Sequence, residues 1–148
     1  MKNITIYSDG SSLGNPGAGG WGTILEYNNH TKELSGGEDN TTNNKMELKG
    51  AIEGLKALKE PCNVKLISDS KYVVQGINEW IKNWIKNNWK TSTKKDVKNK
   101  ELWEEYIKVS KKHNITAIWV KGHDGHIQNE RCDILAREEA QIIKSQNI

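Results

Sequence analysis

Three segments in which apolar and polar residues alternate open the chain, and strand-like and helix-like segments take turns after them. Alternation with period two is typical of half-buried strands, whereas apolar residues at i, i+3 and i+4 are typical of amphipathic helices. The second and third segments are separated only by Asn28-Asn29-His30, which predicts a hairpin. This order favours an α/β fold with one mixed central sheet, its first three strands antiparallel, flanked by helices.

The boundaries follow from the residues that interrupt each pattern. Apolar residues recur at helical spacing from Leu48 to Leu58, and Pro61 lies just beyond them. The glycine-rich stretch from Gly14 to Gly20 predicts a loop or tight turn. The predicted strands are Lys2–Asp9, Trp21–Tyr27, Thr31–Gly36, Asn63–Ser68 and Ile115–Val120, and the predicted helices are Met46–Glu60, Lys71–Trp89 (broken near Trp80), Glu101–Lys112 and Gln128–Lys144.

Length and composition indicate an ordinary globular domain. The chain has 148 residues and a mass of 16.8 kDa, and no linker divides it, so we predict one domain over residues 1–148. No stretch approaches the roughly 20 consecutive apolar residues of a membrane span. Cys62 and Cys132 are far apart and lack metal-ligand spacing. These features predict a protein of the reducing cytoplasm with no membrane contact, and we expect a monomer.

Acidic residues stand where the chemistry of an open α/β sheet is usually found. Asp9 closes the first predicted strand, Asp69 follows the fourth, and Glu47 lies in the first turn of the helix between them. Such carboxylates repel one another unless a cation lies between them. Asp133, on the last predicted helix, is a fourth candidate. Ligands that are all oxygen suit Mg²⁺ or Mn²⁺, and not zinc.

Each carboxylate also has an ordinary structural interpretation. Asn44 and Glu47 have the spacing of a capping box headed by asparagine. Asp69 or Ser70 could cap the helix that follows. Asp133 could be a solvated helix residue that pairs with Arg137, four positions further on.

His123 lies in the loop between Gly122 and Gly125, where the backbone is free to move. Because a structural histidine is more often found on the apolar face of a regular element, this position favours proton transfer.

The segment from Gln75 to Lys100 is basic, with seven lysines against Glu79 and Asp96, although the whole chain has a net charge of only +3. Such an asymmetry suggests a polyanionic partner. The tryptophans interleaved with the lysines fit a buried stripe, since Trp80 and Trp84 lie on one side of a helix. The lysines are exposed under either interpretation, which suits contact with phosphates.

Six short motifs, in order and at matching spacing from about Lys2 to about Ala140, resemble those of bacterial ribonuclease H of type 1. The resemblance implies the ribonuclease H fold, a five-stranded mixed sheet. It also implies an endoribonuclease that hydrolyses the RNA strand of RNA–DNA hybrids with two metal ions, leaving 5′-phosphate and 3′-hydroxyl ends. The motifs are Tyr7-Ser8-Asp9-Gly10-Ser11, Asn15-Pro16-Gly17, Thr41 to Leu48, Ser68 to Val73, Trp119-Val120-Lys121-Gly122-His123 and Asn129 to Asp133.

Carried over by position, the resemblance assigns residues to three roles. Asp9, Glu47, Asp69 and Asp133 are implied to hold Mg²⁺ (or Mn²⁺), two ions when substrate is bound, with His123 as mobile general acid and base. Asn15, Asn43 and Asn44 are implied to face the minor groove of the hybrid, and Thr42 to grip a DNA-strand phosphate. The segment at about 75–100 matches a basic substrate-binding handle, and an N-terminal hybrid-binding domain is not expected. Within the handle the predicted substrate contacts are Trp80, Lys86, Lys90, Lys94 and Lys95.

Three positions depart from the family pattern. Asn40 stands where an arginine is common in the phosphate pocket, which weakens that contact. Lys71 replaces an amide side chain, and its charge favours phosphate binding, so we include it among the substrate-binding residues. Asp124 places a carboxylate beside His123.

Three other functions are alternatives to this interpretation. The first is a relative of the fold that cuts or joins DNA, as integrases and transposases do, which the asparagine loops disfavour. The second is a hybrid-binding module without catalysis, which the four carboxylates disfavour. The third is a lysine-rich structural protein.

Overall fold

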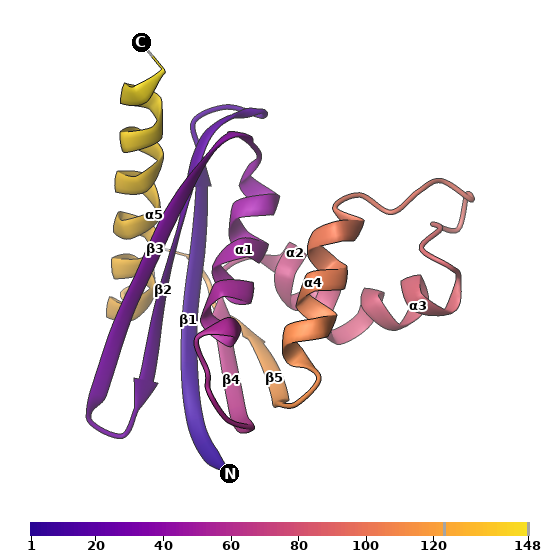
Figure 1. The fold of residues 1–148 in the computed structure, drawn as a ribbon, viewed down its shortest axis with the longest axis horizontal. Helices are drawn as coiled ribbons and strands as arrows, with labels where there is room; N and C mark the ends of the chain where they lie inside the picture. The colour runs from indigo at the N-terminus through magenta and orange to yellow at the C-terminus, as the bar shows by residue number, and fades with distance from the viewer. Residues whose placement is uncertain (123, 148) are drawn as a thin grey trace.

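The computed structural model describes residues 1–122 and 124–147, which form one five-stranded sheet with helices on both faces (Figure 1). The strand order is β3-β2-β1-β4-β5. The first three strands are antiparallel, and β4 and β5 run parallel to β1, which confirms the predicted mixed sheet. The strands are β1 (Lys2–Ser12), β2 (Gly17–Tyr27), β3 (His30–Thr41), β4 (Cys62–Ser68) and β5 (Asn114–Trp119).

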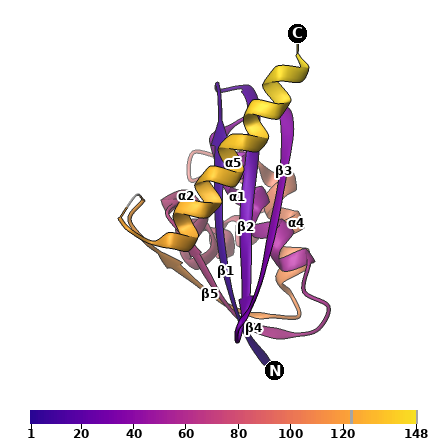
Figure 2. The ribbon, with the colours of Figure 1, turned by 90° about the vertical axis from the view of Figure 1, so that its left-hand side faces the viewer.

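The helices divide between the two faces of the sheet. Helix α5 lies across β1, β2 and β3 on one face, while α1 packs on β1 and β2 from the other (Figure 2). Helix α4 packs against α1. The helices are α1 (Asn43–Lys56), α2 (Lys71–Gln75), the π-helical turn η1 (Gly76–Trp80), α3 (Ile81–Lys86), α4 (Lys100–Ser110) and α5 (Ile127–Gln146).

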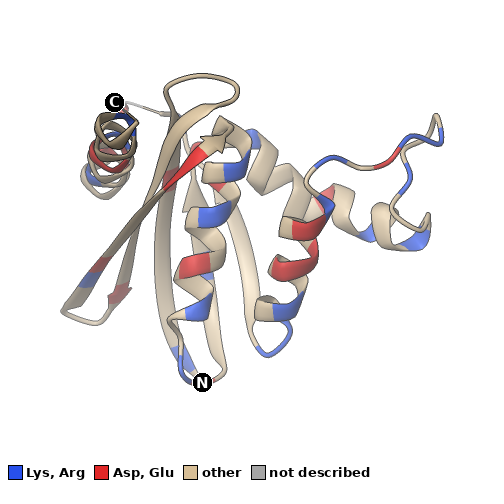
Figure 3. Cartoon of the chain, turned by 45° about the horizontal axis from the view of Figure 1, so that its top comes forward, with Lys and Arg blue, Asp and Glu red and all other residues tan. Residues whose placement is uncertain are grey.

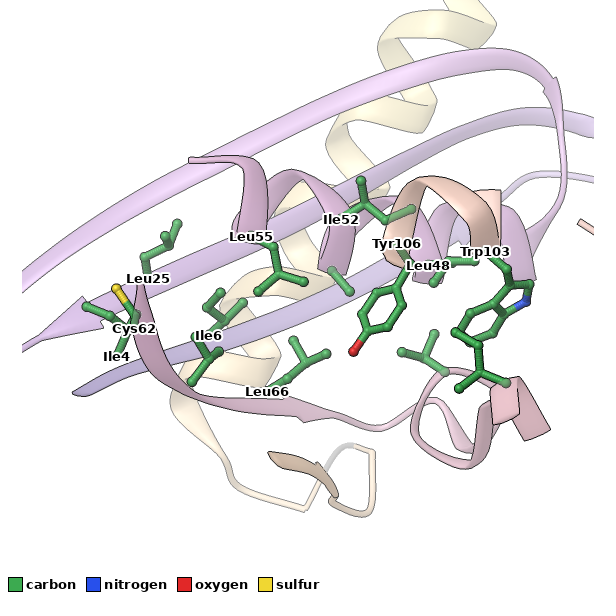
Figure 4. Close-up of a cluster of buried hydrophobic side chains, with 14 residues drawn as sticks. Ile4, Ile6, Leu25, Leu48, Ile52, Leu55, Cys62, Leu66, Trp103 and Tyr106 are labelled. Atoms are coloured by element: carbon green, nitrogen blue, oxygen red, sulfur yellow. The ribbon is translucent and has the colours of Figure 1, made fainter. Parts of the chain in front are cut away.

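The core lies between the sheet and helices α1 and α4 (Figure 4). Ile6 of β1 and Leu66 of β4 are fully buried and lie opposite each other in the parallel ladder. Leu48 and Ile52 of α1 and Trp103 of α4 cover them with no exposed surface. Each such side chain contributes about 1.5–3 kcal/mol by leaving water. This packing fixes α1 over β1, which matters for the site below.

The predicted strand boundaries were wrong at the end of β3, which lies at Thr41 and not at Gly36, and around the glycine-rich stretch. Strand β1 continues past Asp9 to Ser12, and β2 begins at Gly17, so much of the expected loop is strand. The reason is packing. A Cβ on Gly20 would lie 2.3 Å from the carbonyl oxygen of Ala136, and one on Gly22 would lie 2.5 Å from that of Cys132. Glycine in β2 therefore lets the backbone of α5 lie directly on the sheet.

A continuous helical arm formed by α2, η1 and α3 leaves the sheet and carries an aromatic cluster. The predicted break near Trp80 is wrong: the π-helical turn η1 joins α2 to α3 without interruption. The ring of Trp80 lies 6.1 Å from that of Tyr72 and 5.8 Å from that of Trp84, and Trp84 lies 5.4 Å from Trp103 of α4. The contact between Trp84 and Trp103 anchors the arm to the body.

Among the described residues, no helix combines the length and the apolar character needed to cross a membrane.

Candidate active site

Three carboxylates that are far apart in the sequence meet at one end of the sheet. Asp9, Glu47 and Asp69 each offer an oxygen atom, and these atoms lie within 4.8 Å of one another. We call these residues the carboxylate triad. The ladder places two of them side by side, because Ser8 of β1 pairs with Ser68 of β4 and an aspartate follows each serine.

Helix α1 brings the third carboxylate. The structure corrects its expected position, because α1 begins at Asn43 and Glu47 is its fifth residue, in the second turn. The helix packs closely on the sheet where it passes Asp9: a Cβ on Gly50 would lie 3.1 Å from the carbonyl oxygen of Asp9. On the neighbouring strand, the hydroxyl of Thr23 donates a 2.7 Å hydrogen bond to the carbonyl of Gly50.

Capping does not account for Glu47 or Asp69. Thr42 caps α1, since its hydroxyl accepts a 3.3 Å hydrogen bond from the amide of Lys45, and Asn44 lies inside the helix. The asparagine-headed capping box is therefore wrong. Ser70 caps α2 by accepting a hydrogen bond from the amide of Val73.

Burial makes it unfavourable for all three carboxylates of the triad to be ionised together. Asp9 and Glu47 are each 6% exposed. Burial, followed by the charge of Asp69, raises the pKa of Asp9 to about 7, against the opposing hydrogen bond from the amide of Gly10. Burial and the charges of Asp9 and Asp69 raise the pKa of Glu47 well above its usual value.

The polar partners of Glu47 are incomplete. Its Oε1 accepts a 3.4 Å hydrogen bond from the side-chain amide of Asn43, while its Oε2 is buried without a partner. A buried carboxylate oxygen in this state, within reach of two further carboxylates, fits a divalent cation with oxygen ligands. The triad could hold such an ion.

Asp133 lies beside the triad but outside the group of three. It sits on α5, where its Oδ2 accepts a 2.9 Å hydrogen bond from Nε of Arg137, so the pairing that the spacing allowed is present. Its charge nevertheless contributes to the raised pKa of Asp9, which places it within electrostatic reach. The catalytic prediction for His123 falls outside the described residues.

The asparagines expected at the substrate surface lie next to the triad. The side-chain oxygen of Asn15 accepts a 3.4 Å hydrogen bond from the amide of Asn43, which joins the β1–β2 connection to the start of α1. Asn15, Asn43 and Asn44 are all exposed. Lys71 lies at the start of α2, and its Nζ is 5.0 Å from the centre of the Trp119 ring.

A polar pocket of about 390 Å³ lies between the end of β3 and the start of α4. Asn40 lines it, as do Lys45 and Asn99, which the sequence interpretation did not identify. The sequence held no signal for Asn99, because only the fold brings residue 99 next to residue 40. Three carboxylates, those of Glu38, Asp39 and Glu101, also line this pocket.

The lysines of the handle, residues 75–100, are exposed. Figure 3 marks basic positions of this segment in blue. Lys86, Lys94 and Lys95 are exposed, and Lys90 forms an ion pair with Asp96. Trp80 is partly buried in the aromatic cluster. The expected combination of a packed tryptophan stripe and an exposed lysine row is therefore present.

A mixed sheet that brings three carboxylates together, where they could hold a divalent cation, suits the class of metal-dependent enzymes that act on phosphates. Comparison with known proteins gives the family within that class. The RNase H family model matches residues 1–141, and the chain belongs to the ribonuclease H family. It is accordingly an endoribonuclease, as the resemblance predicted.

Comparisons with individual proteins agree with this assignment. A ribonuclease H of Campylobacter concisus is 60% identical over 147 residues, which are 99% of each chain. The crystal structure of LC9-RNase H1, a type 1 RNase H, superposes with a TM-score of 0.88 at 29% identity, covering 97% of this chain and 74% of that one. The fold is also shared with a foamy viral protease-reverse transcriptase bound to an RNA/DNA hybrid, at 18% identity and a TM-score of 0.80; 96% of this chain matches 20% of that one.

Proposed function

We propose that the protein hydrolyses the RNA strand of RNA–DNA hybrids and leaves 5′-phosphate and 3′-hydroxyl ends. The observation that carries the proposal is the carboxylate triad, in which Asp9 and Glu47 are buried and one oxygen of Glu47 has no hydrogen-bond partner. The family membership supplies the substrate class: the names of the relatives denote cleavage of RNA in hybrids.

The proposed ligands are the triad and Asp133, and the proposed metal is Mg²⁺, with Mn²⁺ as an alternative and two ions in the presence of substrate. When bound, the cations activate the attacking water and neutralise charge on the phosphate and the departing 3′ oxygen. Asp9 interacts with both other triad members, since Glu47 and Asp69 each act on its pKa. We therefore expect Asp9 to be the least replaceable of the proposed ligands. We assign the transfer of protons to His123.

The substrate surface is proposed to extend in two directions from the triad. Asn15, Asn43 and Asn44 supply amide groups for the 2′-hydroxyls in the wide minor groove, which distinguish RNA from DNA. Thr42, Lys71 and the handle lie on the path of the phosphates, with Trp80, Lys86, Lys90, Lys94 and Lys95 as handle contacts.

We also propose that the enzyme acts as a monomer in the cytoplasm. Cys62 and Cys132 are both buried free thiols, which suits a reducing compartment.

The test uses end-labelled RNA–DNA, RNA–RNA and DNA–DNA duplexes with Mg²⁺, with Mn²⁺ or with EDTA. We expect cutting of the RNA strand of the hybrid only, and only with metal. Asp9→Asn should lower the rate to less than about a tenth while hybrid binding persists. Glu104→Gln, exposed on α4, serves as the control. Cleavage of DNA duplexes, or hybrid binding without cleavage by the wild type, would reject the proposal.

A further inference from the structure

Trp119, the last residue of β5, places a large aromatic side chain at the surface beside the triad. The residue is 43% exposed, yet two parts of its indole are engaged. Its Nε1 donates a 2.9 Å hydrogen bond to the main-chain carbonyl of Asp69. Its ring lies 5.0 Å, from centre to Nζ, from the ammonium group of Lys71. One side chain therefore contacts a triad member and a predicted phosphate-binding residue.

The hydrogen bond from Trp119 to Asp69 lies just beyond the end of β4, where the chain has left the sheet. Ser68 is the last residue of β4, and its carbonyl accepts a 3.0 Å hydrogen bond from the amide of Val120. Asp69 follows it in the short connection before α2. Because the indole N–H holds the carbonyl of Asp69, it fixes the peptide plane beyond that residue. The direction in which the carboxylate leaves the backbone depends on that plane.

The segment 119–122 also restricts the position of the Asp69 carboxylate itself. A Cβ on Gly122 would lie 2.7 Å from Oδ2 of Asp69. The backbone after β5 thus lies against the carboxylate, and the indole of Trp119 holds the carbonyl of the same residue. Both contacts come from residues 119–122, so their relative position is set by a few covalent bonds.

The ring face has a separate role. An ammonium above an indole is held by the negative face of the ring, and indole is the most effective of the aromatic side chains in this respect. Lys71 has a long, flexible side chain that is otherwise exposed. The Trp119 ring therefore keeps the ammonium group of Lys71 near Asp69, two residues away in the sequence. The phosphates of a bound RNA strand would pass there.

We propose that Trp119 is a positioning residue with two separable actions: its Nε1 orients Asp69 for metal binding, and its ring orients Lys71 for phosphate binding. The inference rests on the proposed function, since it assigns Trp119 to the site that holds metal and hybrid. Supporting residues of this kind typically affect metal affinity or activity about 10- to 100-fold.

The first variant, Trp119→Phe, retains a ring for Lys71 and removes the N–H. We expect the dissociation constant for Mg²⁺, measured by calorimetry on the free protein, to rise about 10-fold. We expect kcat to fall by a similar factor at a fixed low Mg²⁺ concentration and to recover at high Mg²⁺. The KM for hybrid should remain within about two-fold, because the ring is retained.

The second variant, Lys71→Gln, removes the charge and retains the indole. We expect KM to rise about 3-fold and the salt slope of binding to fall by about one, with Mg²⁺ affinity and kcat unchanged. Lys65→Gln, an exposed lysine on β4 facing the open side of the sheet, makes the same charge change away from the triad and should change none of these quantities. Trp119→Leu should combine both effects.

A Trp119→Phe protein that binds Mg²⁺ like the wild type would overturn the inference, as would a Lys71→Gln protein that loses kcat at unchanged KM. A wild type that cuts no hybrid would overturn the proposed function, whereas the calorimetric comparison would still report whether Trp119 orients Asp69. Melting temperatures of all variants separate these effects from unfolding.

Discussion

Gly10 of β1 and Glu47 of α1 touch through their backbones: a Cβ on Gly10 would lie 2.3 Å from the amide nitrogen of Glu47. This contact joins the residue after Asp9 to the residue that supplies the third carboxylate. The separation of two triad members is therefore set by main-chain atoms, which cannot rotate away as side chains can.

Gly10→Ala should accordingly separate Glu47 from Asp9. We expect a loss of about 1–3 kcal/mol in the free energy of unfolding, because the added methyl overlaps backbone. We also expect weaker Mg²⁺ binding, measured by titration calorimetry. Gly76→Ala is the control for an equally close overlap, since its Cβ would lie 2.2 Å from the ring of Trp103, between the helical arm and α4. Equal Mg²⁺ affinity in both variants would show that the contact does not set the spacing.

Asn40→Arg should strengthen hybrid binding. Three carboxylates and one ammonium group, that of Lys45, line the pocket beside Asn40. The charge around a bound phosphate would therefore be net negative and unfavourable. An arginine would add a charge-assisted donor, and we expect KM for hybrid to fall about 3-fold or more with kcat unchanged.

The control for this variant is Asn28→Arg. Asn28 has a φ of 53° and Asn40 a φ of 50°, so both substitutions place an arginine in left-handed backbone and add the same charge. Asn28 lies in the β2–β3 turn at the far end of the sheet from the triad. If both variants bind hybrid equally well, the gain is a general charge effect and the pocket is not a phosphate site.

His113 should make the free energy of unfolding decrease at acidic pH. Its Nδ1 accepts a 3.1 Å hydrogen bond from the amide of Cys62, and its Nε2 is buried without a partner. Burial lowers its pKa, so the folded state resists the protonation that the unfolded chain accepts. Stability is therefore complete above the unfolded pKa of about 6.5 and falls as the pH drops below it.

Urea unfolding from pH 8 to pH 5 measures this effect. His113→Asn retains an acceptor for the Cys62 amide and cannot be protonated, so its stability should fall less over this range. His30→Asn, at the exposed start of β3, should behave like the wild type. Identical pH profiles for wild type and His113→Asn would refute the assignment.

The handle lysines should govern substrate affinity. Replacing Lys86, Lys90, Lys94 and Lys95 with alanine should raise KM and flatten its dependence on salt, with little change in kcat, because phosphate contacts release counterions. Four exposed lysines elsewhere, Lys32, Lys65, Lys111 and Lys112, give a control with the same net charge. A large loss of kcat at constant KM would contradict this expectation.

The sequence predicted the carboxylates better than their surroundings. Asp9 and Asp69 could be placed together because strand patterns are periodic and parallel strands align their ends. Asp9 was wrongly taken as the end of its strand, since glycine carries no side chain from which periodicity can be seen. Gly20 and Gly22 show that these residues serve contact with α5, which is visible only when both elements are in place.

Helix starts show a similar limit. Asn44 and Thr42 are both good caps by residue type, and only the backbone decides that Thr42 is the cap. Asn99 could not be associated with Asn40, and Trp119 could not be associated with Asp69, because neither pair has a local signature. Tertiary contact alone brings them together.

The aromatic cluster of Tyr72, Trp80, Trp84 and Trp103 has a spectroscopic consequence. Neighbouring rings in this series have centroids 5.4–6.1 Å apart, close enough for their electronic transitions to couple. Trp103 belongs to the body and the other three rings belong to the arm, so the Tyr72–Trp103 and Trp84–Trp103 couplings exist only while the two are docked. The protein thus contains an intrinsic optical reporter of arm docking, which circular dichroism can follow without any attached dye.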